Sequence, residues 1–205
     1  MIRMVKKPEE RWQEIVSAAK ELFLEKEYEK TTLQDVMNKV GIAKGTVYHY
    51  FNSKEELLEA VVENMVDEYV VRLRAVLEGA KGGALERMQA LILASNVANE
   101  QGETIERLHR TGNIGLHARL LALTLTKMAP LYAEVIQQGC EEGIFKTEHP
   151  LETAEVLLAG IQLVTDVGFY PWSIEDLIRR SNAIPALAEM QLGAAKGSFS
   201  FLAQG

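Results

Sequence analysis

The 205-residue chain has few of the residues that mark a cross-linked or membrane-bound protein. Cys140 is its single cysteine, so an intramolecular disulfide is impossible and cysteines cannot build a metal site. No stretch approaches the roughly 18 consecutive apolar residues of a membrane-spanning helix. The N-terminal MIRMVKKPEERW also lacks the apolar run of a signal peptide. We therefore expect a soluble cytoplasmic protein with no membrane partner.

The net charge of −7 is unevenly distributed along the chain. Residues 1–54 contain 10 Lys and Arg against 8 Asp and Glu, a balance of +2. Residues 55–205 contain 12 against 21, a balance of −9. The asymmetry is compatible with an N-terminal part that faces phosphate, although a balance of +2 does not establish this.

Apolar side chains recur at spacings of three and four residues, and no long segment alternates with the period of a strand. The first apolar stripe follows Pro8 and comprises Trp12, Ile15, Val16, Ala19, Leu22 and Phe23. A second begins after Thr32, an N-cap with Asp35 in the capping-box position, and stops at Gly41. A long third stripe runs from about residue 54 to the glycine-rich break EGAKGGA at 78–84. These patterns predict an all-α fold.

The remainder of the chain is also expected to be helical, near 84–100, 103–111, 114–126, 128–142, 151–169 and 173–192. Pro130 suits the first turn of the segment 128–142, whereas Pro185 is expected to kink or split the last segment. We expect two domains, with an N-terminal three-helix domain at 1–54 and a larger helical domain at 55–205. The long helix 54–78 connects them.

The stretch GIAKGTVYHYF at 41–51 combines a tight turn with a short second helix, which is the helix-turn-helix pattern. Gly41 permits a positive backbone angle, and Ile42 fills the angle between the helices. Helical spacing turns Val47 and Phe51 toward the core. The outward face then carries Lys44, Gly45, Thr46, Tyr48 and His49.

This outward face is suited to duplex DNA. Gly45 and Thr46 are small enough for the helix N-terminus to enter a major groove. Tyr48 and Tyr50 have hydroxyl groups that can reach phosphate oxygens, and Lys54 at the start of the next helix can hold a phosphate. The alternative is that the rings only pack a small three-helix domain, which we favour for Phe51 and Val47.

The stretch TTLQDVMNKVGIAKGTVYHYFNSKEELLEAV closely resembles the TetR family of bacterial transcription regulators. The resemblance spans residues 9–62, through Phe23, Thr32, Gly41, Gly45, Thr46, Tyr48, Tyr50, Phe51, Lys54 and Leu57. Residues 79–205 resemble the family in layout, and QQGCEEGIFKTEHPLETAEVLLAGIQ looks like the helices of its dimer interface.

The resemblance implies an all-helical homodimer that regulates transcription. Its N-terminal domain would bind a palindromic operator in double-stranded DNA. Its C-terminal domain would bind a small-molecule effector that releases the operator, as expected of a repressor. The expected DNA-contacting residues are Thr32, Ala43, Lys44, Gly45, Thr46, Tyr48, His49, Tyr50 and Lys54.

Three positions depart from the family's usual pattern. The family often has Gly where this chain has Glu27, Ala where Met37 stands, and Ser or Thr where Ala43 stands. Ala43 removes a side-chain N-cap from the recognition helix, at a cost of about 0.5–2 kcal/mol. It also removes a hydroxyl group that can reach phosphate, so Thr46 and the backbone N–H groups must contribute more of the contact there.

Residues 84–126 supply candidates for an effector pocket, because ligand sites are mostly apolar with a few convergent polar groups. The candidates are Met88, Ile92, Asn96, Asn99, His109, Asn113, His117 and Leu120. A His or Asn near a helix end is more often a cap or a solvated residue. The spacing of the histidines indicates no metal site.

No cofactor or enzymatic activity is expected. The chain has no phosphate-cradling loop, and Cys140 lies in a helical segment of apolar and acidic residues. The alternative to a ligand-responsive repressor is an architectural or cell-division DNA-binding protein on the same fold, bound to many sites without an inducer.

Overall fold

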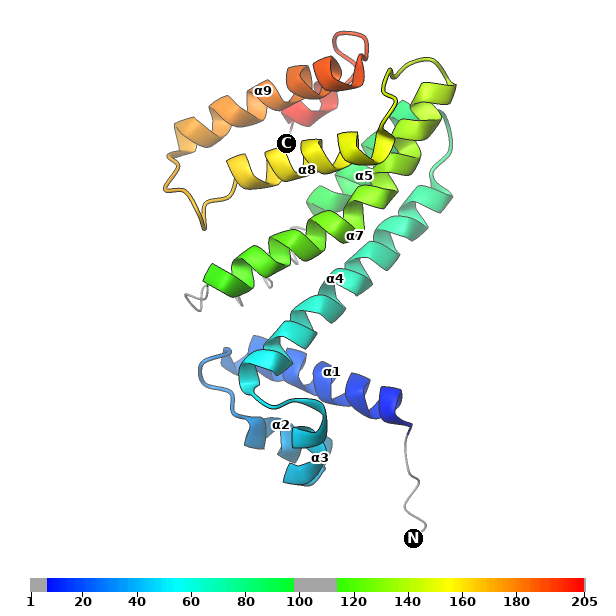
Figure 1. Cartoon of the computed structure of the whole chain (residues 1–205). Helices are drawn as coiled ribbons and strands as arrows, with labels where there is room; N and C mark the ends of the chain where they lie inside the picture. The colour runs from blue at the N-terminus through cyan, green and yellow to red at the C-terminus, as the bar shows by residue number, and fades with distance from the viewer. Residues whose placement is uncertain (1–6, 98–113, 205) are drawn as a thin grey trace. The chain divides into compact units, whose positions relative to one another are not determined.

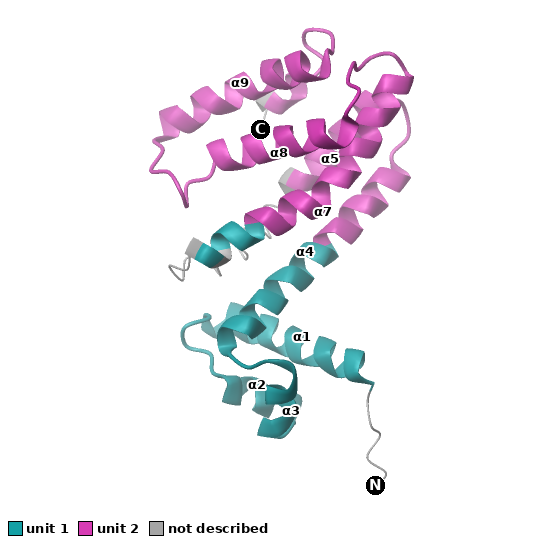
Figure 2. Ribbon diagram, viewed as in Figure 1, with its two compact units in different colours: residues 1–68, 100–120 teal, residues 69–99, 121–205 magenta. Residues whose placement is uncertain are grey.

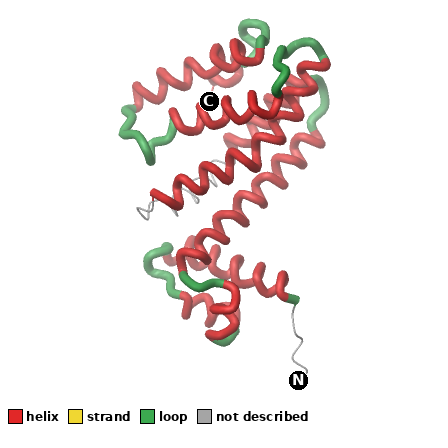
Figure 3. Tube along the Cα trace, viewed as in Figure 1, coloured by secondary structure: helices red, strands yellow, loops and turns green. Residues whose placement is uncertain are grey.

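The computed structural model describes residues 7–97 and 114–204, and within these ranges the chain is helical and has no strand (Figures 1 and 3). The N-terminal helices are α1 (Pro8–Lys26), α2 (Leu33–Val40), α3 (Lys44–Tyr50) and α4 (Lys54–Gly79). They are followed by α5 (Ala84–Val97), α7 (Ile114–Glu141), α8 (Pro150–Val164), α9 (Ile174–Leu192) and the short 3-10 helix η1 (Ser200–Gln204). The all-α prediction is confirmed. None of the described helices is long and apolar enough to cross a membrane.

The chain divides into two compact units (Figure 2). Unit 1 comprises residues 1–68 and 100–120, and unit 2 comprises residues 69–99 and 121–205. Helix α4 therefore contributes its first turns to unit 1 and its last turns to unit 2. The domain boundary expected at residue 54 stays a prediction, because it separates a DNA-binding part from a ligand-binding part and the two units are defined only by their internal contacts.

Unit 1 has a core made by the apolar stripes that the sequence predicts. Its buried side chains include Ile15, Val16, Ala19, Leu22, Phe23, Val36, Met37, Val47, Phe51, Leu57, Leu58, Val61 and Val62. The ring of Trp12 in α1 lies 6.3 Å from that of Phe51 between centroids. This packing joins α1 to the end of α3, so the small helix-turn-helix is supported by a larger core.

Unit 2 has a separate core drawn from the end of α4 and from α5, α7, α8, α9 and η1. Leu73, Leu77, Met88, Leu91, Leu131, Val135, Ile136 and Leu192 belong to it. Gly139 is required by a close approach, because a Cβ atom there would lie 2.1 Å from the ring of Phe145. That ring stacks on Phe199, which anchors the C-terminal segment.

Neither helix-internal proline divides its helix into two. Pro130 lies inside the single helix α7, whereas separate helices were expected at 114–126 and 128–142. Pro185 lies inside α9 without splitting it. A proline inside a helix removes a backbone hydrogen bond, and its ring crowds the carbonyl group four residues earlier. The burial of Met128, Ala129 and Leu131 offsets this cost in α7.

Candidate nucleic-acid interface

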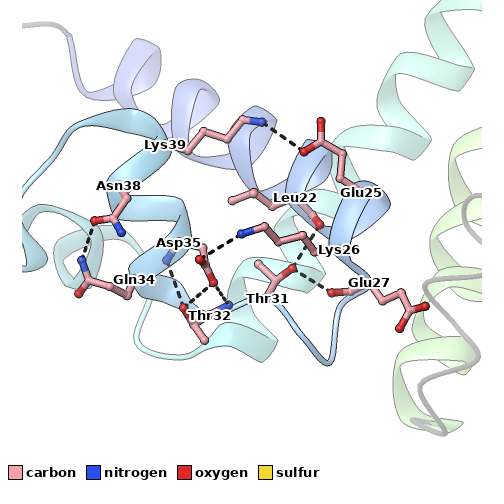
Figure 4. Close-up of polar contacts among 10 residues, drawn as sticks. All are labelled: Leu22, Glu25, Lys26, Glu27, Thr31, Thr32, Gln34, Asp35, Asn38 and Lys39. Carbon is pink, nitrogen blue, oxygen red and sulfur yellow. Dashed lines mark hydrogen bonds and ion pairs between the residues drawn. The ribbon is translucent and has the colours of Figure 1, made fainter.

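The turn between α1 and α2 is fixed by backbone and side-chain contacts in unit 1 (Figure 4). The buried Thr31 hydroxyl donates to the carbonyl oxygens of Leu22, at 3.2 Å, and Glu27, at 2.9 Å. Glu27 has φ 69° and ψ 149°, a conformation that is essentially confined to glycine. This explains physically why glycine is usual at this position in the family that the sequence resembles.

Helix α2 begins with the predicted capping box (Figure 4). The Thr32 hydroxyl accepts from the Asp35 backbone N–H at 3.1 Å, and the Thr32 N–H donates to the Asp35 carboxylate at 2.9 Å. The hydrogen bonds from Thr32, together with Lys26, lower the pKa of Asp35 to about 2. The carboxylate is thus held in its charged form at the positive end of α2.

The predicted turn between α2 and α3 is confirmed. Gly41 has φ 72° and ψ 38°, and its N–H donates to the Met37 carbonyl at 2.8 Å. The N–H of Ile42 donates to the same carbonyl at 3.1 Å. Left-handed backbone at this position favours glycine, so Gly41 sets the angle at which α3 leaves α2.

Helix α3 has no side-chain N-cap, as the alanine at its start implies. Ala43 has extended backbone angles and makes no side-chain capping bond, although its carbonyl accepts from the Thr46 N–H at 2.9 Å. The first turn of α3 therefore presents uncapped backbone N–H groups beside small side chains. Such an N-terminus favours negative charge.

The two faces of α3 follow the helical spacing. Val47 and Phe51 are buried, with 0% and 2% of their surface exposed. Lys44, Gly45, Tyr48 and His49 are exposed, and Thr46 is half-buried. Tyr50 is also half-buried, with its ring 5.1 Å from His49 and 6.5 Å from Phe51 between centroids.

Gly45 is not explained by packing within the protein. A Cβ atom added at Gly45 would meet no other atom within 4 Å, and its φ is not positive. Glycine destabilises a helix relative to alanine, so this residue costs stability without relieving a clash inside the protein. The space over Gly45 is therefore open to a molecule outside the chain.

Two lysines at this surface lie over aromatic rings. The Lys44 ammonium is 5.4 Å from the Tyr48 ring centroid, and the Lys54 ammonium is 4.0 Å from that of Tyr28. Lys54 is the first residue of α4, where Ser53 accepts from the Glu56 N–H at 3.0 Å. Each ammonium group thus lies within the range of a cation–π interaction with a ring of the protein itself.

The residues predicted for an effector pocket are distributed over both units, and their grouping into one pocket stays a prediction. Met88 is buried in unit 2, where Ile92 packs against the same core, and Asn96 belongs to α5. His117 is half-buried and Leu120 is buried, both in the part of α7 that belongs to unit 1. The remaining candidates, Asn99, His109 and Asn113, lie outside the described residues.

A polar cluster in unit 2 was not predicted from the sequence. The Tyr69 hydroxyl donates to the Ser95 carbonyl at 3.4 Å, and the hydroxyl groups of Ser95 and Tyr132 are 3.1 Å apart. Burial raises the pKa of Tyr132 to about 12. The three residues come from α4, α5 and α7, so no local spacing connects them.

An open groove lies elsewhere in unit 2, between α7 and the start of α8. Its lining is formed by Pro130, Ala133, Glu134, Gln137, Gln138, Glu141, Glu148, His149, Pro150, Leu151 and Glu152. None of these residues was predicted for the effector. Four of the lining residues are glutamates, whereas pockets for apolar ligands are lined mainly by apolar side chains.

Two family models match the chain over the helices just described. Residues 15–61, which include α2 and α3, match the model "Bacterial regulatory proteins, tetR family". Residues 94–187 match "Tetracyclin repressor-like, C-terminal domain". The chain belongs to the TetR family. Its members are DNA-binding transcription regulators, not enzymes, so α2 and α3 are the DNA-binding helix-turn-helix.

Individual relatives agree with this assignment. The chain is 27% identical over 139 residues to the HTH-type transcriptional repressor KstR2 of Mycobacterium tuberculosis strain H37Rv, which covers 66% of the chain and 69% of the relative. It is 28% identical over 152 residues to the uncharacterized HTH-type transcriptional regulator YfiR of Bacillus subtilis, covering 71% and 73%. In fold, it is similar to the crystal structure of a TetR-family regulator from Mesorhizobium loti, with a TM-score of 0.62 and 22% identity, covering 92% of this chain and 98% of that one.

Proposed function

We propose that this TetR-family regulator is a cytoplasmic repressor that binds a palindromic operator as a homodimer and is released by a small, mostly apolar effector. The exposed face of α3 carries the proposal, above all the open space over Gly45. A helix with a small residue near its N-terminus can approach the base edges in a major groove. The name of the relative KstR2 supports repression over the architectural alternative.

The residues around α3 divide by the part of DNA that each would contact. Tyr48, Tyr50 and Lys54 would bind phosphate oxygens, and the Thr32 hydroxyl at the start of α2 would add another contact. The base edges would be read by Lys44 and Thr46, with Ala43, Gly45 and His49 completing the surface. Phosphate contacts set affinity and register, whereas base contacts set the preferred sequence.

The homodimer is supported by apolar surface on α8, α9 and the loop between them. The exposed apolar side chains there are Leu151, Val156, Leu163, Val164, Val167, Tyr170, Ile174, Ile178, Leu187 and Met190. The sequence also favours an interface through the helices near 128–142 and 151–169, and segment 128–142 stays a candidate although its apolar side chains pack in the core of unit 2. Exposed apolar side chains in such number are typical of an interface, so we propose that a second copy of the chain binds to α8 and α9.

The effector would act through α4, which is a continuous helix with turns in both compact units. An effector that binds more tightly to one placement of the DNA-binding helices must, by linkage, bind less tightly to the other. A difference of about 1–3 kcal/mol gives a 5- to 150-fold change in operator affinity. Met88 is buried in unit 2 and Leu120 in unit 1, so an effector in contact with either residue would replace part of the packing of that unit's own core.

Operator binding is tested on a duplex selected from a random-sequence pool by the wild-type protein. Tyr48→Phe and Lys54→Ala are expected to weaken binding by similar factors on the selected duplex and on a scrambled one, because phosphates are common to both. Fluorescence anisotropy measures the affinities of both variants and of the wild type for the two duplexes. A loss confined to the selected duplex would show that these residues read bases instead.

The effector is tested separately by a thermal-shift screen of apolar metabolites and drugs. Each compound that raises the melting temperature is added to the complex with the selected duplex. At least one is expected to release the DNA. Compounds that stabilise the protein but never change operator affinity would contradict the switch and favour the architectural alternative.

A further inference from the structure

The Lys54 side chain contacts two residues that are distant from it in the sequence of unit 1. Its ammonium lies 4.0 Å from the ring centroid of Tyr28 and donates to the Glu29 carbonyl at 3.4 Å. Lys54 begins α4, whereas Tyr28 and Glu29 belong to the turn between α1 and α2. The contact therefore joins a loop that precedes the helix-turn-helix in the sequence to the helix that follows it.

The Tyr28 ring is itself held in place. It meets the ring of Phe23 edge to face, with the centroids 5.2 Å apart and the planes at 73°, and Phe23 is only 2% exposed. The Tyr28 carbonyl accepts from the Thr31 N–H at 3.1 Å, and Thr31 is in turn bonded to α1. The ring is therefore a fixed platform rather than a mobile surface group.

The position of Lys54 is unfavourable for the helix that it begins. A cation at the N-terminus of a helix opposes the positive end of the helix dipole. Lysine also loses much side-chain freedom when its ammonium is fixed. The face of an aromatic ring attracts the ammonium and compensates for part of both effects, which leaves the charge ordered at the surface.

We propose that Tyr28 is a positioning residue for DNA binding, whose ring holds the Lys54 ammonium where a backbone phosphate of duplex DNA will lie. The inference rests on the phosphate role proposed for Lys54. Because the ammonium is ordered before DNA arrives, less side-chain freedom is lost on binding. Tyr28 does not itself need to touch the DNA.

The test compares Tyr28→Met, Tyr28→Phe, Lys54→Ala and the double variant Tyr28→Met/Lys54→Ala on the selected duplex, over a range of salt concentrations. Tyr28→Phe keeps the ring and is expected to bind as the wild type does. Tyr28→Met keeps apolar bulk without a ring face and is expected to bind about three- to tenfold more weakly. Lys54→Ala is expected to reduce the steepness of the salt dependence by about 1.8, which is about 0.9 for each of the two subunits on the operator. In the Lys54→Ala background, Tyr28→Met should have no further effect on affinity.

A merely structural Tyr28 would give a different pattern. Tyr28→Met would then weaken binding equally with and without Lys54, which would overturn the inference, as would wild-type affinity in Tyr28→Met. NMR of the Lys54 ε-methylene provides a readout independent of DNA, with an upfield ring-current shift expected in the wild type and Tyr28→Phe. The absence of that shift in both proteins would also overturn it.

The same measurements distinguish a failure of the Tyr28 role from a failure of DNA binding or of the Lys54 phosphate contact. Failure of the wild type to bind any duplex would contradict DNA binding by the protein. Unchanged affinity and salt slope in Lys54→Ala would contradict the phosphate contact and, with it, the role of Tyr28. A weakened Lys54→Ala beside an unaffected Tyr28→Met would contradict only the positioning role.

Discussion

Gly45 lowers the stability of α3 and leaves space for DNA to approach the exposed face of this helix. Gly45→Ala is expected to raise the free energy of unfolding by about 0.5–1 kcal/mol, because alanine is the better helix former and no clash results. The same methyl group faces the proposed DNA surface, so operator affinity should fall. Chemical denaturation and fluorescence anisotropy measure the two effects.

Gly79 provides a matched control for this substitution. It also lies in a helix, and a Cβ atom there would meet nothing within 4 Å. Gly79→Ala should therefore leave operator affinity unchanged. Unchanged DNA binding by Gly45→Ala would show that α3 does not approach the bases at this residue.

Glu27 stores backbone strain at the end of α1. Its φ of 69° with ψ of 149° costs about 1–3 kcal/mol for a residue with a side chain. Glu27→Gly should therefore raise the free energy of unfolding by about 1 kcal/mol, even though the exposed ion pair with Lys30 is lost. Thermal and urea denaturation provide the measurement.

Glu29 is the control residue for this prediction, since it is exposed, acidic and in the same turn but has no positive φ. Glu29→Gly should lower the free energy of unfolding by about 0.5–1 kcal/mol through the added freedom of the unfolded chain. If Glu27→Gly lowered the free energy of unfolding as much as Glu29→Gly does, the backbone at Glu27 would not be strained.

The capping box of α2 makes the free energy of unfolding depend on pH. The pKa of Asp35 is lowered to about 2, first by the Thr32 hydroxyl. A depressed folded-state pKa stabilises the protein above the unfolded value of about 4, and this contribution is lost as the pH falls toward 2. Wild type should thus exceed Asp35→Asn in stability at pH 7, and the difference should vanish near pH 2.

Urea denaturation of both proteins from pH 7 to pH 2 measures this difference. Glu10→Gln in the first turn of α1 is the control, because that turn has no side-chain N-cap. Its offset from the wild type should depend much less on pH. A constant difference between wild type and Asp35→Asn across the range would contradict the role of the ionised carboxylate.

Local signals were sufficient to predict the elements around α3. Thr32, Asp35 and Gly41 act through neighbours three or four residues away, so their spacing is visible in the sequence. The continuity of α7 through Pro130 was not predictable, because packing in unit 2 overrides the local preference for a break. Nor did any spacing connect Tyr28 with Lys54, since their contact depends on how α1 and α4 meet in the fold.

At the scale of the whole molecule, dimerisation should depend on the apolar surface of α8 and α9. Val156 in α8 is 60% exposed, and Val156→Glu is expected to give a monomer at micromolar concentration that no longer binds the operator tightly. Val71→Glu on α4 is the matched control, because Val71 is 68% exposed but lies outside that surface.

Sedimentation velocity and operator binding together decide this prediction. The Val71→Glu protein should remain a dimer and keep its affinity. A Val156→Glu protein that stays dimeric would place the interface on another surface. A monomer with unchanged operator affinity would show that DNA binding does not require a second copy.

Helix α3 of each subunit is proposed to read bases in one of two symmetry-related half-sites. The most direct measurement is a selection from a random-sequence duplex pool, carried out in parallel with the wild type and Lys44→Ala. The wild type should enrich an inverted repeat whose half-site centres lie about 34–36 Å apart, or a multiple of this distance. Lys44→Ala should change the preferred base at the same place in both halves and keep the spacing. No enrichment, a sequence without the repeat, or an identical preference in Lys44→Ala would contradict the claim.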